Sequence, residues 1–398
     1  MRVETLGAGS VVRARARAGR RVGGHDRAVG VLLLAAAAGA CSPSGGDAQA
    51  RGNFQWATDF SKHTVPMEEI VPGGPPKDGI PAIDNPRFES IEAGGAWLKD
   101  SEPVVFFENR GVARAYPYRI LIQHEIVNDE VGGLPVTITF CPLCNTALAF
   151  DRRHGDRLLD FGTTGWLRHS DLVMYDRQTE TWWQQASGEG IVGELAGEEL
   201  RFLAAQTVSW GDFKAAYPDG QVLSRDTGFG RDYGRNPYVG YDDLEGGKPW
   251  SHFFLKKTDD RLRPMERVVA VLAGDRTMAF PFSILADVRV VNHEVDGRPI
   301  VILWAPGTAS GLDAPQVADG RDVGASGVFD RRLGGRELTF EPLTPGRFRD
   351  RETGTEWNIM GQGLSGPLEG RVLRPVSHGD YFWFAWAAFR PETRIWKP

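Results

Sequence analysis

An internal repeat constrains the fold of this chain more than any other feature of its sequence. Residues 113–148 match residues 277–312 without a gap, and the match resumes where 175–183 meets 349–357. Self-similarity over such lengths indicates a duplicated folding unit. The sequence therefore predicts two pseudo-equivalent units in one chain.

Each unit is predicted to be mostly β-strand. Apolar runs alternate with turn residues, as in "EIVNDEVGGLPVTITF", where Gly132 and Gly133 separate two strand-like halves. This pattern is typical of hairpins. Helix signals are few, and the best ones begin at Ser209 and Ser377, each with an aspartate three residues later in a capping-box spacing. We expect a mainly β protein with a few short helices (α+β), built from two pseudo-equivalent β-rich repeats.

Some repeated residues are expected to serve the fold. The pair Asp176-Arg177 recurs as Asp350-Arg351, and Trp183 recurs as Trp357. A large aromatic residue that both copies keep is best explained by core packing. We therefore expect Arg177 and Trp183 to serve the fold.

The chain is predicted to contain five segments. Residues 41–53 are small and polar, as flexible tethers are. Residues 225–264 are rich in Gly and Tyr and have no counterpart in the second copy. The segments are a lipoprotein signal peptide (1–40), a flexible tether (41–53), a first β-rich unit (54–224), a connector (225–264) and a second, degenerate β-rich unit without cysteines (265–398).

The first 40 residues have the features of an export signal. They carry seven arginines and two acidic residues, and they end with the apolar run "AVGVLLLAAAAGA", which is too short to span a bilayer. The stretch "AAGAC" resembles the lipobox of bacterial lipoproteins, in which the cysteine is acylated. This resemblance implies a protein of the cell envelope, outside the cytoplasm, whose partner is a membrane reached through a lipid on Cys41. An ordinary export signal with a chance cysteine is the alternative.

The charge balance excludes some functions. The chain has 46 basic and 52 acidic residues, and 39 and 50 of them lie beyond residue 40, which gives that part a net charge of −11. An acidic surface disfavours nucleic acid as a partner. The chain also lacks a Gly-rich phosphate loop between a strand and a helix and a G-x-S-x-G motif, so neither a nucleotide enzyme nor a hydrolase of that type is expected.

Cys141 and Cys144 form a Cys-x-x-Cys motif in the first unit only. The second copy keeps the proline of the bend but has Ala305 and Thr308 in place of the cysteines, so the fold should not need the thiols. A disulfide that closes so short a loop removes little unfolded-state entropy, and its strain makes it easy to reduce. We therefore expect a reversible redox pair. A structural disulfide and a zinc half-site are alternatives, although zinc would need two more ligands.

Other residues are candidates for a site around the thiols. A protonated His124 would lower the pKa of the attacking thiol, for which Cys141 is the candidate by analogy with other Cys-Pro-x-Cys proteins. Alternatively, Cys141, Cys144, His124 and Met174 would form a soft ligand set suited to copper. Three aspartates are candidates to line a polar site beside the thiols: Asp78, Asp84 and Asp171.

Six motifs together resemble one known family. They are "DGIPAIDNP" at 78–86, "ARAYP" at 113–117, "HEIVND" at 124–129, "FCPLCNTALAFDR" at 140–152, "SDLVMYDRQT" at 170–179 and "RDYGRNPYVGY" at 231–241. With these motifs the chain is similar to the domain of unknown function 3179, a family of uncharacterised exported bacterial and archaeal proteins with a CPLC motif, some of which are labelled selenoproteins. The family brings no established activity. The selenoprotein label implies redox chemistry near the motif, because a selenol is useful mainly where a thiolate would attack or be oxidised.

Three function classes remain, in order of preference. The first is a thiol-disulfide oxidoreductase at the cell surface that acts on an unknown redox partner or small molecule. The second is a protein that binds copper or another soft metal, and the third is a surface lipoprotein that binds a partner without chemistry.

Overall fold

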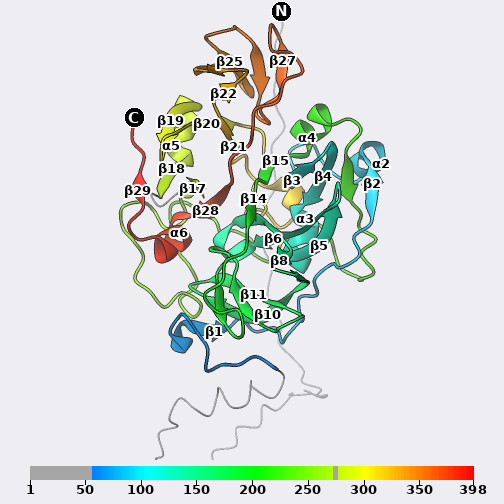
Figure 1. Cartoon of the computed structure of the whole chain (residues 1–398), viewed down its shortest axis with the longest axis vertical. Coiled ribbons are helices and arrows are strands. Elements are labelled where there is room, and N and C mark those ends of the chain that lie inside the picture. Colours follow the sequence, from blue (N-terminus) through cyan, green and yellow to red (C-terminus); the bar gives the residue numbers. More distant parts are fainter. Residues whose placement is uncertain (1–55, 272–276) are drawn as a thin grey trace, which may run out of the picture. The chain divides into compact units, whose positions relative to one another are not determined.

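The computed structural model describes residues 56–271 and 277–398 of the chain (Figure 1). The predicted signal peptide and tether, including Cys41, lie outside the described residues. The described residues are mainly strand, and their helices are five to seven residues long. The predicted fold class is therefore confirmed.

The elements of the first half run from residue 67 to residue 223. They are η2 (Met67–Glu69), β1 (Ile70–Pro72), β2 (Phe88–Ser90), α2 (Ile91–Gly95), β3 (Pro103–Asn109), β4 (Val112–Pro117), α3 (Tyr118–His124), β5 (Ile126–Val131), β6 (Leu134–Cys141), η3 (Pro142–Cys144) and β7 (Thr146–Asp151). The chain continues with β8 (Arg153–His154), β9 (Arg157–Leu158), β10 (Phe161–Arg168), β11 (Asp171–Asp176), β12 (Trp182–Gln184), β13 (Gly190–Val192), β14 (Phe202–Leu203), β15 (Gln206–Ser209), α4 (Trp210–Ala216) and β16 (Gln221–Leu223).

The second half repeats this order of strands and helices with fewer extra elements. Its elements are β17 (Arg267–Val271), β18 (Met278–Pro281), α5 (Phe282–Val288), β19 (Val290–Val295), β20 (Arg298–Ala305), η4 (Val317–Asp319), β21 (Ala325–Asp330), β22 (Arg332–Leu333), β23 (Arg336–Glu337), β24 (Phe340–Thr344), β25 (Arg347–Asp350), β26 (Glu356–Asn358), β27 (Gly363–Ser365), β28 (His378–Phe382), α6 (Trp383–Phe389) and β29 (Arg394–Ile395). The run β3-β4-α3-β5-β6-β7 corresponds to β17-β18-α5-β19-β20-β21, so the sequence repeat is a structural repeat.

The sheets of the two halves have matching topologies. In the first half the strand orders are β15-β3-β4-β16-β2, β14-β7-β6-β5 and β1-β10-β11-β12-β13. In the second half they are β28-β17-β18-β29, β19-β20-β21 and β24-β25-β26-β27. Each half thus contains a sheet with one parallel strand pair, a meander and an antiparallel four- or five-stranded sheet.

The short helices α3 and α5 show how closely the repeats agree. Each follows a proline, Pro117 or Pro281, with φ −66° and ψ 135°. Each ends at a residue in the left-handed region, Glu125 with φ 59° or Arg289 with φ 60°. A non-glycine residue there is uncommon, and its recurrence in both copies means that the turn geometry is part of the fold.

One predicted helix start is confirmed and the other is wrong. Ser209 is the N-cap of α4, and its hydroxyl accepts a hydrogen bond from the backbone N–H of Asp212. Ser377 does not begin a helix, because the residues after it form β28, which pairs with β17. The helix α6 begins after that strand, at Trp383.

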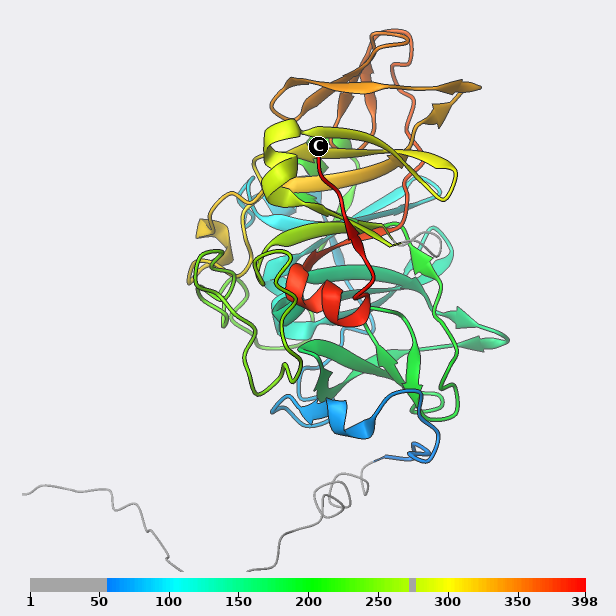
Figure 2. The same cartoon turned by 90° about the vertical axis from the view of Figure 1, so that its left-hand side faces the viewer.

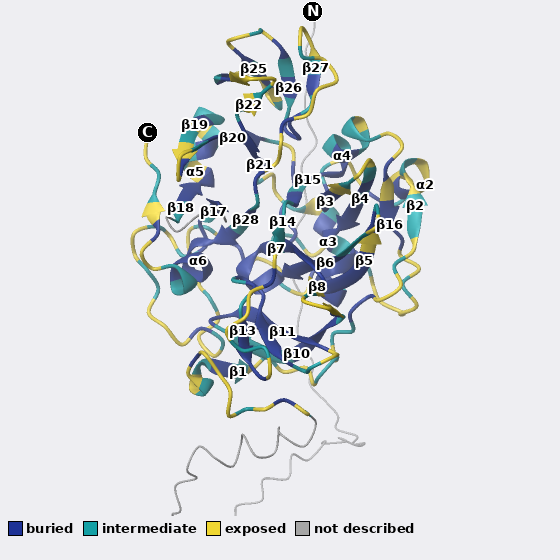
Figure 3. Ribbon diagram, in the orientation of Figure 1, coloured by how far each residue is buried: buried dark blue, intermediate teal, exposed yellow. Residues whose placement is uncertain are grey.

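The main core is shared between the halves. Cys141, Met174 and Trp183 of the first half belong to the same buried cluster as Tyr381 and Trp386 of β28 and α6. Figure 2 shows α6 lying against the strands of the first repeat. In Figure 3, β6, β7 and β11 are buried along most of their length.

The connector at 225–264 contains neither a helix nor a strand, and all of its residues lie in the described part of the chain. Its Tyr241 and Phe254 nevertheless join the shared core. The connector therefore both links the halves and packs beside the cysteines. Among the helices of residues 56–271 and 277–398, none has the length and apolar character that crossing a bilayer requires.

Candidate functional site

The Cys-x-x-Cys motif forms the bend between β6 and β7. Cys141 is the last residue of β6, and Pro142 opens the single 3₁₀ turn that ends at Cys144. Asn145 follows in the left-handed region with φ 53° and leads into β7. Pro fits the start of a helical turn because its missing N–H has no partner there. The turn places both thiols on the same side of the bend, and both are free cysteines.

A two-residue turn presents Asp171 to this bend. His169 and Ser170 have φ values of 54° and 67°, and they connect Arg168 to Asp171, which pair across β10 and β11. The backbone N–H of Ser170 donates to the carbonyl of Phe253 in the connector at 2.8 Å. The Ser170 carbonyl accepts a hydrogen bond from the Cys141 thiol at 3.6 Å.

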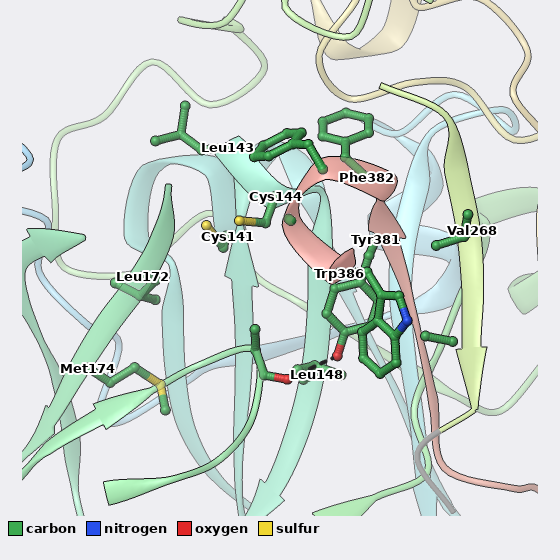
Figure 4. Packing of buried hydrophobic residues seen from close by; sticks show 14 of the residues in the cluster. Cys141, Leu143, Cys144, Leu148, Leu172, Met174, Val268, Tyr381, Phe382 and Trp386 are labelled. Atoms are coloured by element: carbon green, nitrogen blue, oxygen red, sulfur yellow. Dashed lines mark hydrogen bonds between the residues drawn. The ribbon is translucent and has the colours of Figure 1, made fainter. Parts of the chain in front are cut away.

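The thiols and Asp171 form one compact cluster. Both Sγ atoms and a carboxylate oxygen of Asp171 lie within 4.8 Å of one another, and Figure 4 shows the two sulfurs side by side. Oδ2 of Asp171 accepts hydrogen bonds from Gln184 Nε2 at 2.6 Å and from the Ala186 N–H at 2.8 Å. Oδ1 is buried and has no hydrogen-bond partner among the described residues. One carboxylate oxygen of Asp171 is therefore unpaired.

Burial controls the ionisation of this cluster. Cys144 and Asp171 are fully buried and Cys141 is 2% exposed. Burial raises the pKa of both thiols and raises the pKa of Asp171 to about 6. At neutral pH the thiols therefore keep their protons, while Asp171, with a pKa of about 6, is mostly ionised.

Glu125 adds a second buried carboxyl group nearby. It occupies the left-handed position after α3 and lines a cavity of about 360 Å³ together with Leu143 and Leu172. Burial and, to a lesser extent, the charge of Asp171 raise the pKa of Glu125 to about 8. Glu125 is therefore mostly protonated at neutral pH.

His124 is not brought to the thiols. Its Nδ1 lies 2.7 Å from the carbonyl oxygen of Pro81, and its Nε2 lies 2.6 Å from the hydroxyl of Tyr233. Burial lowers the pKa of His124, so its protonated form is disfavoured at neutral pH. Both features disagree with the expected role of a protonated His124 in thiolate formation.

The other predicted residues are also held elsewhere. Met174 is fully buried in the core, and Figure 4 shows its side chain well away from the two cysteine sulfurs. Asp78 accepts a hydrogen bond from the hydroxyl of Tyr175. Asp84 accepts from Asn128 at 2.9 Å and from Arg177 at 2.7 Å. Of the three candidate aspartates, Asp171 alone belongs to the described thiol cluster.

Glu125 was not among the residues predicted from the sequence, and Asp171 ranked no higher there than Asp78 and Asp84. The repeat comparison holds a signal for Glu125, which aligns with Arg289. Asp171 lies outside the matched stretches, and extending the match at 175–183 back along the chain places Pro345 opposite it. Pro345 lies in the turn between Thr344 and Arg347, which pair across the hairpin. The second copy therefore lacks Asp171 as well as the thiols, and the whole cluster is specific to the first copy.

The comparisons with known proteins give a family but no characterised relative. A family model described as "Protein of unknown function (DUF3179)" matches residues 77–393. Neither the curated proteins nor the solved structures provide a match. The matched region contains both repeats, the connector and the thiol cluster. The chain therefore belongs to the DUF3179 family, whose function is unknown.

Proposed function

We propose that Cys141 and Cys144 form a reversible dithiol/disulfide couple in which Asp171 accepts a proton from the attacking thiol. The observation that carries this proposal is the compact cluster of Asp171 with both thiols, in which one buried carboxylate oxygen has no hydrogen-bond partner among the described residues. A thiol reacts as its thiolate, and burial disfavours that charge here. An adjacent carboxylate can take the proton while the thiol reacts. No separate thiolate then has to form in the buried site.

The degenerate second repeat supports the same proposal. It builds the equivalent bend with Ala305 and Thr308, so thiols are not required for this turn. The proposed role assigns the proton transfer to Asp171 in place of His124. The expected product is a disulfide that closes the short loop from Cys141 to Cys144, and such a bond is easily reduced.

Asp171→Asn is expected to slow oxidation of the dithiol by about a hundredfold, because an amide cannot accept the thiol proton. The measurement is the rate of free-thiol loss in the reduced full-length protein after addition of diamide, a small uncharged thiol oxidant. Exposed Asp219→Asn serves as the control and should match the wild type. The double variant Cys141→Ala with Cys144→Thr should fold and show no reaction at these positions.

Two results would contradict the redox proposal. One is a pair that stays oxidised in strongly reducing buffer, which would make the disulfide structural. The other is an Asp171→Asn protein that reacts as fast as Asp219→Asn, which would remove Asp171 from the reaction.

The same three groups favour a metal site as the second candidate. Two thiolates and a carboxylate suit a soft or borderline ion such as copper or zinc. A bound cation would stabilise the thiolates and offset the burial that raises their pKa values. The ligand set would contain Asp171 in place of His124 and Met174. Stoichiometric metal in the purified protein that also blocks alkylation would favour this candidate over the redox couple.

We further propose that the protein works outside the cytoplasm, attached to a membrane by a lipid on Cys41. The lipobox-like sequence and the polar tether after it support this proposal. Cys41→Ser is expected to abolish acylation and to release the protein from the membrane fraction, which fractionation and intact-mass analysis measure. Unchanged processing and membrane association in Cys41→Ser would contradict the anchor.

A further inference from the structure

The cavity beside the thiol cluster has the size and surface of a small-molecule site. Its volume is about 360 Å³, within the range of ligand pockets. Leu143 from the Cys-x-x-Cys motif and Leu172, which follows Asp171, contribute to its wall. Trp250 and Phe253 of the connector complete an apolar surface. The wall of the cavity thus includes the direct chain neighbours of Cys144 and Asp171, while the two sulfur atoms lie behind that wall.

The apolar wall of the cavity also contains the carboxyl group of Glu125. Glu125 is the acidic side chain among the described lining residues, and its backbone is fixed by the left-handed turn after α3. A carboxyl group can donate a hydrogen bond to a carbonyl oxygen or accept one from a hydroxyl. The wall thus suits an uncharged ring that carries an oxygen atom.

The burial of the thiols limits which oxidants can reach them. With Cys141 2% exposed and Cys144 fully buried, a disulfide on a folded partner protein cannot approach either sulfur. The apolar surroundings also disfavour a step that leaves a net charge behind. The partner should therefore be small, uncharged and able to take two protons together with two electrons.

We propose that this cavity binds a quinone and that the quinone oxidises the Cys141–Cys144 dithiol. The inference rests on the proposed redox function and names the class of its small-molecule partner. A quinone is a flat, uncharged ring with carbonyl oxygens, which fits the apolar walls and Glu125. Its reduction to a hydroquinone consumes two electrons and two protons.

The reaction balances with the groups at the site. The Cys141 sulfur adds to a ring carbon and forms a C–S bond, while its proton passes through Asp171 to a ring oxygen. The Cys144 sulfur then attacks the Cys141 sulfur, so that an S–S bond forms and the C–S bond breaks with its electron pair remaining on the ring. The proton of Cys144 goes to the second ring oxygen. Two thiols and one quinone give one disulfide and one hydroquinone.

The test uses the reduced full-length protein and dimethoxy-methyl-benzoquinone under anaerobic conditions. The expected result is one hydroquinone formed for each pair of thiols lost, with a rate that saturates as quinone increases. Leu167→Trp and Ile80→Trp enlarge two partly buried lining residues and should lower the apparent second-order rate constant by about tenfold or more. Val372→Trp changes an exposed residue of the second half and should react like the wild type. Equal rates in all of these proteins would overturn the proposed site.

Binding is measured separately with Cys141→Ala/Cys144→Thr, which cannot react at the motif. Quenching of tryptophan fluorescence should show saturable binding of the quinone to this protein, because Trp250 and Trp166 line the cavity. Adding Glu125→Leu should weaken the binding by about fivefold, the loss of one hydrogen bond.

Two outcomes separate this inference from the proposed function. A wild-type pair that diamide oxidises and dithiothreitol reduces again, but that neither binds nor reduces the quinone, would overturn the inference and leave the redox couple intact. A protein that binds the quinone but whose thiols no oxidant converts would overturn the proposed function and, with it, the electron transfer inferred here.

Discussion

Asp176→Ala is expected to lower the free energy of unfolding by about 3 to 5 kcal/mol. Asp176 is fully buried. Its carboxylate accepts hydrogen bonds from the backbone N–H of Thr179 at 2.6 Å and from Trp183 Nε1 at 2.9 Å. The Thr179 hydroxyl donates to it as well. Removing the carboxylate leaves several buried donors without partners, and each costs roughly 1 to 3 kcal/mol. Urea unfolding measures the loss.

The second repeat provides a matched replicate of this experiment. Asp350 is also fully buried. It accepts from the Thr353 N–H at 2.7 Å and from Trp357 Nε1 at 2.9 Å. Asp350→Ala should therefore cost about as much as Asp176→Ala, whereas exposed Asp219→Ala should change stability by less than about 0.5 kcal/mol. If Asp176→Ala resembled Asp219→Ala, these hydrogen bonds would not stabilise the hairpin.

These hydrogen bonds explain why the fold could be predicted from the sequence. The repeat kept Asp176 with Trp183, and Asp350 with Trp357, at the same spacing, because one hairpin geometry needs both members of each pair. Local patterns also gave the strand-rich class and the cap at Ser209. They failed at Ser377, where pairing with β17 overrides a local helix signal.

The candidate site could be predicted only in part. The Cys-x-x-Cys motif is local, and its absence from the second copy pointed to the first half. The neighbours of the thiols come from distant segments: Asp171 from the start of β11, and Tyr381 from β28 in the second half. Sequence proximity suggested His124, but α3 ends so that the ring of His124 contacts Tyr233 while Glu125 faces the cavity. No periodic pattern in the sequence shows which of these two neighbouring side chains faces the cavity.

Raising the pH from about 5 to 8 is expected to destabilise the wild-type protein relative to Glu125→Gln by a few kcal/mol. Burial, assisted by the charge of Asp171, raises the pKa of Glu125 from 4.5 to about 8. The folded state therefore holds a proton that the unfolded chain releases above 4.5. The contribution of Glu125 to stability is complete below pH 4.5, and it is lost as the pH rises through the folded pKa of about 8. Glutamine does not titrate, so the difference between the two unfolding curves isolates Glu125.

Asp171→Asn tests the electrostatic part of this prediction. Because the negative charge of Asp171 contributes to the raised pKa of Glu125, its removal should move the Glu125 transition to lower pH. The burial of Glu125 is unchanged, so the transition should still lie above 4.5. The measurement compares Asp171→Asn with Asp171→Asn/Glu125→Gln over the same pH range. The plots of unfolding free energy against pH could also run parallel from pH 5 to 8, either for this pair or for the wild type and Glu125→Gln. That result would mean that Glu125 is ionised in the folded state. The cavity wall would then carry a carboxylate in place of a neutral carboxyl group. A carboxylate only accepts hydrogen bonds, so the ligand would have to donate one to Glu125.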